Sequence, residues 1–177
     1  LNRTINMMKR YYDCIIPEPT NPNEDTDLKN EFQEGIGTVH SLYNSLAYNK
    51  ILERIWHLVD VTNKYIDHQA PWTLVKSEDG KKRLATVMYN TTECLRIIAI
   101  LIYPFMPKSA ETMMEQLGIK ISIKEQGLET IKIWGGLKPG TKVQPGSQLF
   151  PRIEDKEAEK LLATIEVVKK SDQKKRS

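Results

Sequence analysis

Reactive and metal-binding side chains are scarce in this sequence. Its 177 residues include only two cysteines and three histidines, and neither type recurs at the short spacings typical of a metal site. Two cysteines are too few for a disulfide framework, so we expect Cys14 and Cys94 to be reduced, mostly buried thiols of a cytoplasmic protein. We assign no metal to His40, His57 or His68.

A catalytic constellation is also missing. The sequence has no glycine-rich phosphate loop and no paired histidines, and carboxylates such as Glu53, Asp60 and Asp67 stand singly among other polar residues. Gly35 and Gly37 follow no strand, so they are expected to permit a close helix crossing rather than to bind phosphate. The chain by itself is therefore expected to carry no active site.

Long apolar runs are absent as well. The richest stretch, Ile97 to Phe105, is interrupted by Pro104, which indicates a buried helix end in a soluble protein rather than a membrane span. A net charge of +3 permits an anionic partner without identifying one. Leu1, Ile5 and Met8 already have helical spacing, so we expect the chain to begin inside a helix of a longer protein.

The spacing of apolar residues predicts an all-α fold, a bundle of about five helices. The fourth helix becomes apolar all round near its end and is predicted to be the most buried. A polar turn from Lys76 to Lys82 is expected to precede it. The predicted helices run from Leu1 to about Cys14, from about Asp25 to Leu46, from Ala47 to Gln69, through Leu84 to Ile102, and from Pro107 to a cap at Gly118.

Residues 119–146 have a different pattern. Apolar and polar residues alternate over Ile119–Ile123 and Ile131–Ile133, and a glycine- and proline-rich stretch follows. We expect an irregular return segment with room for a short strand or two. The predicted organisation is a helical domain over 1–153, a C-terminal helix over 154–170 that packs back on it, and a basic tail or linker over 171–177.

The stretch Tyr65-Ile66-Asp67-His68-Gln69-Ala70-Pro71-Trp72 closes the third helix. Pro71 cannot continue a helix and biases Ala70 out of the helical region, so the helix is predicted to end near Gln69. Trp72 then stands beyond a rigid helix end, where an indole can act as a stacking platform. From position and composition alone, Trp72 is better explained as a plug under a loop, and Arg3 as a solvated surface charge.

Three motifs resemble the anticodon-binding domain of methionyl-tRNA synthetases, which are class I aminoacyl-tRNA synthetases. Ala70-Pro71-Trp72, after Asn63-Lys64-Tyr65-Ile66-Asp67, resembles the anticodon-recognition segment. Leu1-Asn2-Arg3-Thr4 resembles a family stretch that ends in a polar residue and arginine, and Leu149-Phe150-Pro151-Arg152-Ile153 resembles the closing motif. The motifs bracket nearly the whole chain in the family's order, and the resemblance reverses the preferences for a plug and for a solvated charge.

The resemblance implies that Trp72 and Arg3 contact the anticodon, with Asp67 and Pro71 as neighbours that shape the site. Trp72 would stack on the cytosine of the CAU anticodon, and Arg3 would donate hydrogen bonds to that base. A carboxylate or carbonyl near Asp67 would accept from its amine. The family pattern also has an asparagine four positions before the arginine, at a position that would precede Leu1.

The implied parent enzyme is a cytoplasmic methionine–tRNA ligase of protein biosynthesis, which attaches methionine to tRNA(Met) using ATP. ATP with Mg, and zinc where a member has a zinc knuckle, belong to a catalytic domain whose signatures this sequence lacks. The expected partners are the tRNA(Met) anticodon loop and that catalytic domain, without a cofactor in this chain and without a membrane.

Two alternatives remain open. One is the equivalent domain of a cysteinyl, leucyl or isoleucyl synthetase, against which Ala70-Pro71-Trp72 argues. The other is a helical protein-interaction module anchored by the tryptophan. A basic, partly open groove around Trp72 favours RNA, whereas a flat apolar patch favours a protein partner.

Overall fold

The structure is a computed structural model that describes residues 1–151, 153–155 and 158. The chain divides into two units, Leu1–Gly146 and Ser147–Ser177. The helices whose bounds are described all lie in the first unit. They are α1 (Asn2–Tyr12), α2 (Thr26–Asn44), α3 (Tyr48–Gln69), α4 (Pro71–Leu74), α5 (Glu78–Ile102), α6 (Pro107–Gln116) and the 3-10 helices η1 (Ile123–Glu125) and η2 (Leu128–Ile131). The helix expected over 154–170 falls almost entirely outside the described residues, and the tail over 171–177 does so completely.

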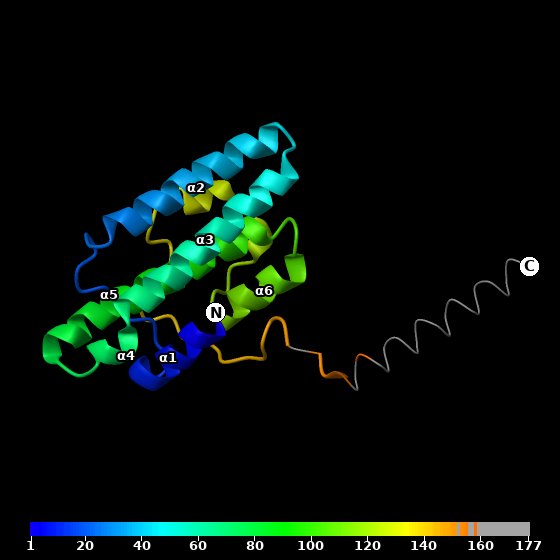
Figure 1. Cartoon of the computed structure of the whole chain (residues 1–177). Coiled ribbons are helices and arrows are strands. Elements are labelled where there is room, and N and C mark those ends of the chain that lie inside the picture. The colour runs from blue at the N-terminus through cyan, green and yellow to red at the C-terminus, as the bar shows by residue number, and fades with distance from the viewer. Residues whose placement is uncertain (152, 156–157, 159–177) are drawn as a thin grey trace, which may run out of the picture. The chain divides into compact units, whose positions relative to one another are not determined.

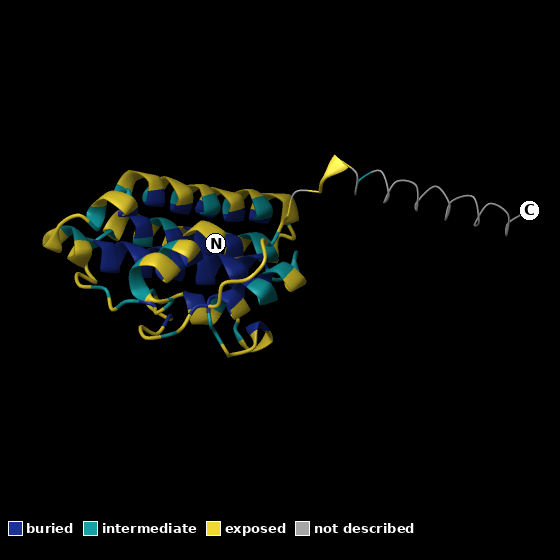
Figure 2. Cartoon of the chain, turned by 90° about the horizontal axis from the view of Figure 1, so that it is seen from below, coloured by how far each residue is buried: buried dark blue, intermediate teal, exposed yellow. Residues whose placement is uncertain are grey.

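Helix α5 is the central element of the first unit. Every residue from Leu84 to Ile102 is buried, and the helix contacts α1, α3, α4 and α6. Figure 1 shows α2 and α3 running side by side in opposite directions, with α1 and α4 close together near one end of the unit. The buried residues gather on the sides of the helices that face one another (Figure 2). The all-α prediction and the burial of the fourth predicted helix are confirmed.

By length and composition, α5 could also cross a membrane, which the apolar spacing in the sequence did not predict. An 18-residue window of this helix has a mean hydropathy of 1.3. However, 94% of that window is buried inside the protein. A helix that is apolar all round and enclosed by other helices is typical of a domain core.

The two outer helices α2 and α3 cross closely at a glycine. A Cβ added at Gly35 would lie 3.0 Å from both terminal methyl carbons of Leu58, which is tighter than ordinary van der Waals contact. At Gly37 an added Cβ meets nothing within 4 Å. The predicted role in helix crossing therefore holds for Gly35 and not for Gly37.

The start of α5 differs from the prediction of a polar turn over Lys76 to Lys82. The helix begins at Glu78, because the Ser77 hydroxyl oxygen accepts a hydrogen bond from the Gly80 N–H at 3.1 Å. Two acidic residues in the first turn also favour this helix end. The serine cap thus starts the helix within the stretch Lys76 to Lys82, whose composition had suggested a loop.

The return segment contains η1 and η2, and no strand is formed in residues 119–146. An isolated antiparallel bridge joins Ile15 to Lys142. The alternating isoleucines do not share one face, since Ile123 and Ile131 are buried whereas Ile121 and Ile133 are exposed. The strand expectation is wrong because the alternation reflects single anchor residues at 3-10 turns.

The buried carboxylate of Glu93 fastens this return segment to α5. It accepts backbone N–H bonds from Gly135 at 3.0 Å, Gly136 at 2.9 Å and Leu137 at 3.1 Å. It also pairs with Arg96 at 2.7 Å, and the Arg96 side chain is only 4% exposed. A Cβ at Gly136 would lie 2.6 Å from an Arg96 nitrogen, so a side chain there would force the buried guanidinium to move.

We expect Glu93→Ala to lower the free energy of unfolding by about 3–5 kcal/mol, because it leaves a buried guanidinium without its counter-charge. Urea denaturation measures the change. Glu129→Ala removes an exposed pair with Lys132 of 2.6 Å and serves as the control, with an expected cost of about 1 kcal/mol or less. Equal costs for the two variants would show that Glu93 does not fasten the segment.

Candidate nucleic-acid interface

The chain turns sharply where α3 ends. Ala70 adopts the left-handed conformation, with φ of 43°, and its N–H bonds to the Ile66 carbonyl at 3.0 Å. Pro71 is the first residue of α4 and is buried, a position in which its missing N–H costs nothing. The predicted helix end at Gln69 is confirmed. Trp72 lies in a one-turn helix rather than in a loop.

The indole of Trp72 is 44% exposed. The turn beneath it is held by Thr73, whose backbone N–H and hydroxyl both donate to the Ala70 carbonyl, at 2.8 Å and 2.7 Å. A ring that is this open does not plug the interior. Its backbone is fixed by this turn, and part of the residue remains open to solvent.

The structure brings Arg3, Asp67 and Trp72 together from α1, α3 and α4. The Arg3 Cζ atom lies 5.0 Å from the centroid of the Trp72 ring, and Arg3 Nη2 is 2.8 Å from Asp67 Oδ1. The Arg3 and Asp67 side chains are 50% and 63% exposed. Of the four residues singled out in the sequence, only Pro71 is buried, and it positions the turn below the other three.

A hollow of about 510 Å³ opens beside this contact, and we call it the Trp72 hollow. Sequence reasoning missed most of its wall, although the signal was present: Asn6, Met7 and Arg10 follow Arg3 at helical spacing along α1, where Asn6 and Arg10 are exposed and Met7 is partly buried. The hollow is lined by Asn2, Arg3, Asn6, Met7, Arg10, Tyr11 and Trp72.

The wall supplied by α1 is basic. Within Asn2–Tyr12, all of which the structure describes, Arg3, Lys9 and Arg10 occur without any aspartate or glutamate. The open ring therefore sits beside a cationic hollow and not on a flat apolar patch. No cluster of three or more potential metal ligands occurs among the residues that the structure describes.

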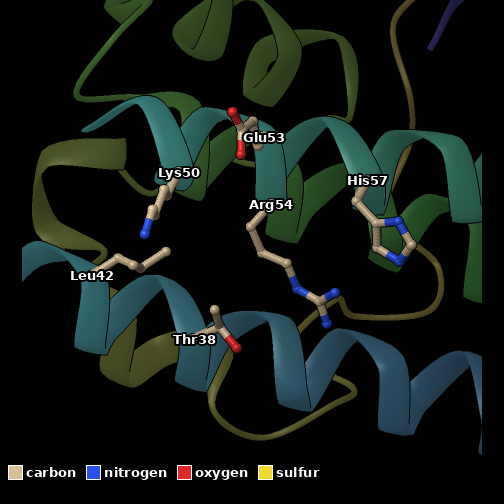
Figure 3. A pocket seen from close by; sticks show the side chains of 6 residues that line it. All are labelled: Thr38, Leu42, Lys50, Glu53, Arg54 and His57. Atoms are coloured by element: carbon tan, nitrogen blue, oxygen red, sulfur yellow. The ribbon is translucent and has the colours of Figure 1, made fainter. Parts of the chain in front are cut away.

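Another hollow, of about 380 Å³, lies between α2 and α3 and contains none of the predicted site residues (Figure 3). Figure 3 shows Arg54 reaching from α3 toward α2. Arg54 Nη2 pairs with Glu31 at 2.8 Å, and His57 Nε2 lies 2.9 Å from the same carboxylate. These contacts join the two helices, which gives the polar groups at this place a structural role.

A polar cluster around Arg83 fixes the end of α3. Arg83 Nη2 pairs with Asp25 at 2.6 Å, and Arg83 Nε donates to the Gln69 side-chain oxygen at 3.1 Å. The Tyr65 hydroxyl donates to Asp25 at 2.7 Å. The cluster thereby links the start of α2, the last two turns of α3 and the beginning of α5. Its contact with α3 is made at Gln69, the residue directly before the turn at Ala70.

The electrostatics of this cluster favour a charged carboxylate. Burial alone would raise the pKa of Asp25, but the hydrogen bonds from Arg83, Tyr65 and Asn90 outweigh it and hold that pKa below its usual value. Burial, together with the bond to Asp25, raises the pKa of Tyr65. Tyr65 is therefore a neutral donor to an ionised Asp25 at neutral pH.

Comparison with known proteins shows the family to which the chain is similar. The family model for the anticodon binding domain of methionyl tRNA ligase matches residues 16–169, a range that includes Asp67, Pro71 and Trp72 and begins after Arg3. The methionine–tRNA ligase of Caldanaerobacter subterraneus subsp. tengcongensis is 43% identical over 175 residues, which are 98% of this chain and 26% of that protein. The Bacillus subtilis enzyme is 39% identical over 160 residues, 89% of this chain and 24% of that protein.

Solved structures give the same result. Apo methionyl-tRNA synthetase from Mycobacterium tuberculosis matches with a TM-score of 0.76 and 31% sequence identity, over 86% of this chain and 30% of that chain. The same enzyme with methionyl-adenylate matches with a TM-score of 0.75 and 31% identity, over 85% of this chain and 30% of that chain.

The fold is that of a helical anticodon-binding domain of an aminoacyl-tRNA synthetase. Within that class, this chain belongs to the family of methionyl-tRNA ligase anticodon-binding domains. It spans about a quarter of the length of the curated relatives it matches. The comparisons therefore favour the methionyl family over the cysteinyl, leucyl and isoleucyl alternatives.

We expect Asp25→Asn to lower the free energy of unfolding at neutral pH by about 1–3 kcal/mol, because the half-buried Arg83 guanidinium loses one of its two charged partners and keeps only Glu24. A carboxyl whose pKa is lower in the folded than in the unfolded chain, where it is about 3.9, contributes stability above that value. That contribution is lost as the pH falls through the folded pKa. The stability difference between wild type and Asp25→Asn should therefore shrink below about pH 4.

Urea denaturation at a series of pH values checks this expectation. Asp60→Asn is the control, because Asp60 is exposed within α3, away from the helix ends, and the substitution should leave the pH profile unchanged. A difference between wild type and Asp25→Asn that stays constant through the acid range would contradict the assignment of a lowered pKa to Asp25.

Proposed function

We propose that this chain binds the anticodon loop of methionine tRNA and recognises its first base, the cytosine of CAU. The observation that carries the proposal is the meeting of Arg3 and Trp72, 5.0 Å apart from Cζ to ring centroid, at an open basic hollow. Membership of the methionyl family supports tRNA as the partner. Two side chains distant in sequence thereby form one site for one unpaired base.

Stacking on Trp72 provides the first part of recognition. Bases in an RNA loop can leave the stack and lie against an aromatic ring, and each such contact is worth about 1–3 kcal/mol. The ring is 44% exposed, and the Arg3 guanidinium lies over it. A base stacked on the remaining exposed surface of the indole lies beside the guanidinium.

Hydrogen bonding provides the second part. The Watson–Crick edge of cytosine carries two acceptors and one amino donor. A guanidinium has five N–H donors. The ion pair between Arg3 and Asp67 uses Arg3 Nη2. The second N–H of Nη2 forms a two-donor edge with Nη1 or Nε and can donate with it to the two cytosine acceptors, while the Asp67 carboxylate accepts from the amino group. Uracil replaces that amino group with a carbonyl oxygen, which the carboxylate disfavours.

Pro71 takes part as a positioning residue. It is buried at the start of α4, so it does not touch the base. Its fixed φ sets the direction in which the one-turn helix leaves α3. In this proposal the proline determines where the indole lies, and the indole performs the contact.

The same proposal places the chain in a cytoplasmic methionine–tRNA ligase that attaches methionine to tRNA(Met) using ATP. ATP with its Mg, and zinc where it is used, are assigned to the catalytic part of that enzyme, which is also a partner of this chain. The two free cysteines, Cys14 and Cys94, fit a reducing compartment. The curated relatives, of which this chain covers about a quarter, support this wider role.

Trp72→Ala should weaken binding of a CAU anticodon stem-loop by about 1–3 kcal/mol, because one stacked base loses its platform. The melting temperature should stay nearly unchanged, since Trp72 is exposed and lies outside the buried core. Fluorescence anisotropy with a labelled stem-loop and thermal unfolding measure the two effects. Trp56→Ala, which removes a 55% exposed indole from α3 outside the Trp72 hollow, is the matched control. A fall in melting temperature with unchanged affinity would restore the plug explanation.

Arg3→Ala should reduce the preference for cytosine over uracil at the first anticodon position by about 1–3 kcal/mol, as expected when a paired set of base contacts is removed. The measurement is the ratio of affinities for two stem-loops that differ at that base alone. Lys9→Ala removes a neighbouring charge from α1 that does not line the Trp72 hollow, and it should leave the ratio unchanged. Equal losses on both stem-loops for Arg3→Ala would reassign Arg3 to a phosphate contact.

A further inference from the structure

A second hollow adjoins the Trp72 hollow along α1. Its volume is about 540 Å³, and its wall includes Arg10, Tyr11, Val75, Lys81 and Lys82. Arg10 and Tyr11 line both hollows, and the Arg10 guanidinium lies 5.5 Å from the Tyr11 ring centroid. These two side chains form a shared boundary, so a strand that leaves Trp72 over them enters the second hollow.

The charge of this second hollow is positive. Three cationic side chains, Arg10, Lys81 and Lys82, face one carboxylate of the lining, Glu78. Lys81 is 57% exposed and pairs with Glu78 at 2.6 Å, and Lys82 is 66% exposed and lies 3.5 Å from Asp79. Exposed pairs of this kind contribute little to stability, so the ammonium groups can turn to another anion at small cost.

We propose that this hollow, hereafter the phosphate groove, binds the sugar-phosphate backbone of the nucleotides next to the base held at Trp72. The proposal rests on the proposed function, because it takes the same RNA strand as its occupant. A lysine ammonium is a compact point charge that suits a phosphate and carries no base preference of its own. The excess of cations over carboxylates suits the phosphate, the negatively charged group that every nucleotide of the strand carries.

In this proposal the phosphate groove raises the affinity for RNA of any sequence, and the Trp72 hollow provides the preference for one base. Contacts to phosphates fix the register of a nucleic acid on its protein, and they strengthen binding to every sequence alike. Counter-ions are released when a cation meets a phosphate, so these contacts also make affinity depend on salt. Both properties differ from those expected of Arg3 and Trp72, and they allow the two hollows to be tested separately.

The test compares Lys81→Ala/Lys82→Ala with wild type on the CAU stem-loop and on a stem-loop with a changed anticodon, over a range of salt concentrations. We expect a several-fold loss of affinity that is the same for both RNAs. The slope of log affinity against log salt should become shallower by roughly 0.7 for each phosphate of a single strand that the variant no longer neutralises. Glu78→Gln should have the opposite effect and tighten binding to both RNAs, because it removes the carboxylate that faces the lysines.

Lys108→Ala/Lys132→Ala is the matched control, because it removes the same net charge from α6 and from the end of η2. Lys132 resembles Lys81 closely: it is 50% exposed and forms an i,i+3 pair of 2.6 Å with Glu129. An equal loss in the control and in Lys81→Ala/Lys82→Ala overturns the phosphate groove, and so does a loss confined to the CAU stem-loop. Trp72→Ala is measured in parallel. If Trp72→Ala loses affinity while Lys81→Ala/Lys82→Ala does not, the phosphate groove is refuted and the proposed function is not.

Discussion

Arg83 joins three helices at the place where the chain turns toward Trp72. Its guanidinium bonds to Asp25 before α2 and to Gln69 at the end of α3, and its own backbone belongs to the buried helix α5. Since Gln69 immediately precedes Ala70, this polar cluster fixes the direction in which α3 ends. The left-handed Ala70 and the rigid Pro71 then leave little freedom in the position of the indole.

The exposed contacts of the site depend on this frame. Arg3 and Asp67 are half exposed, and pairs of this kind add little stability, so their contact orients the two groups rather than holding the fold together. The fold is held by α5 and by the Glu93 carboxylate that fastens the return segment. Stability and recognition therefore rest on different residues, which permits substitutions at the site in a protein that still folds.

Local signals were sufficient for much of the fold. Pro71 predicted the end of α3, Gly118 with φ of 73° caps α6 as expected, and the apolar spacing predicted the buried helix. Two features were missed because they depend on single hydrogen bonds or on isolated anchors: the Ser77 cap that starts α5 and the absence of strands in the return segment. Periodicity alone could not show that α1 lies beside α4. Arg3 and Trp72 were paired by family resemblance, and Arg10 and Tyr11 were not expected there.

The central claim is that one unpaired cytosine occupies the hollow shared by Arg3 and Trp72. The most direct measurement is the affinity of the unaltered chain for the tRNA(Met) anticodon stem-loop and for the same stem-loop with a different first anticodon base, at one fixed salt concentration. We expect the change of that base to weaken binding by on the order of 10- to 100-fold, the range of one well-formed set of base contacts. Equal affinities for the two stem-loops would contradict recognition of the base and leave only binding of the backbone.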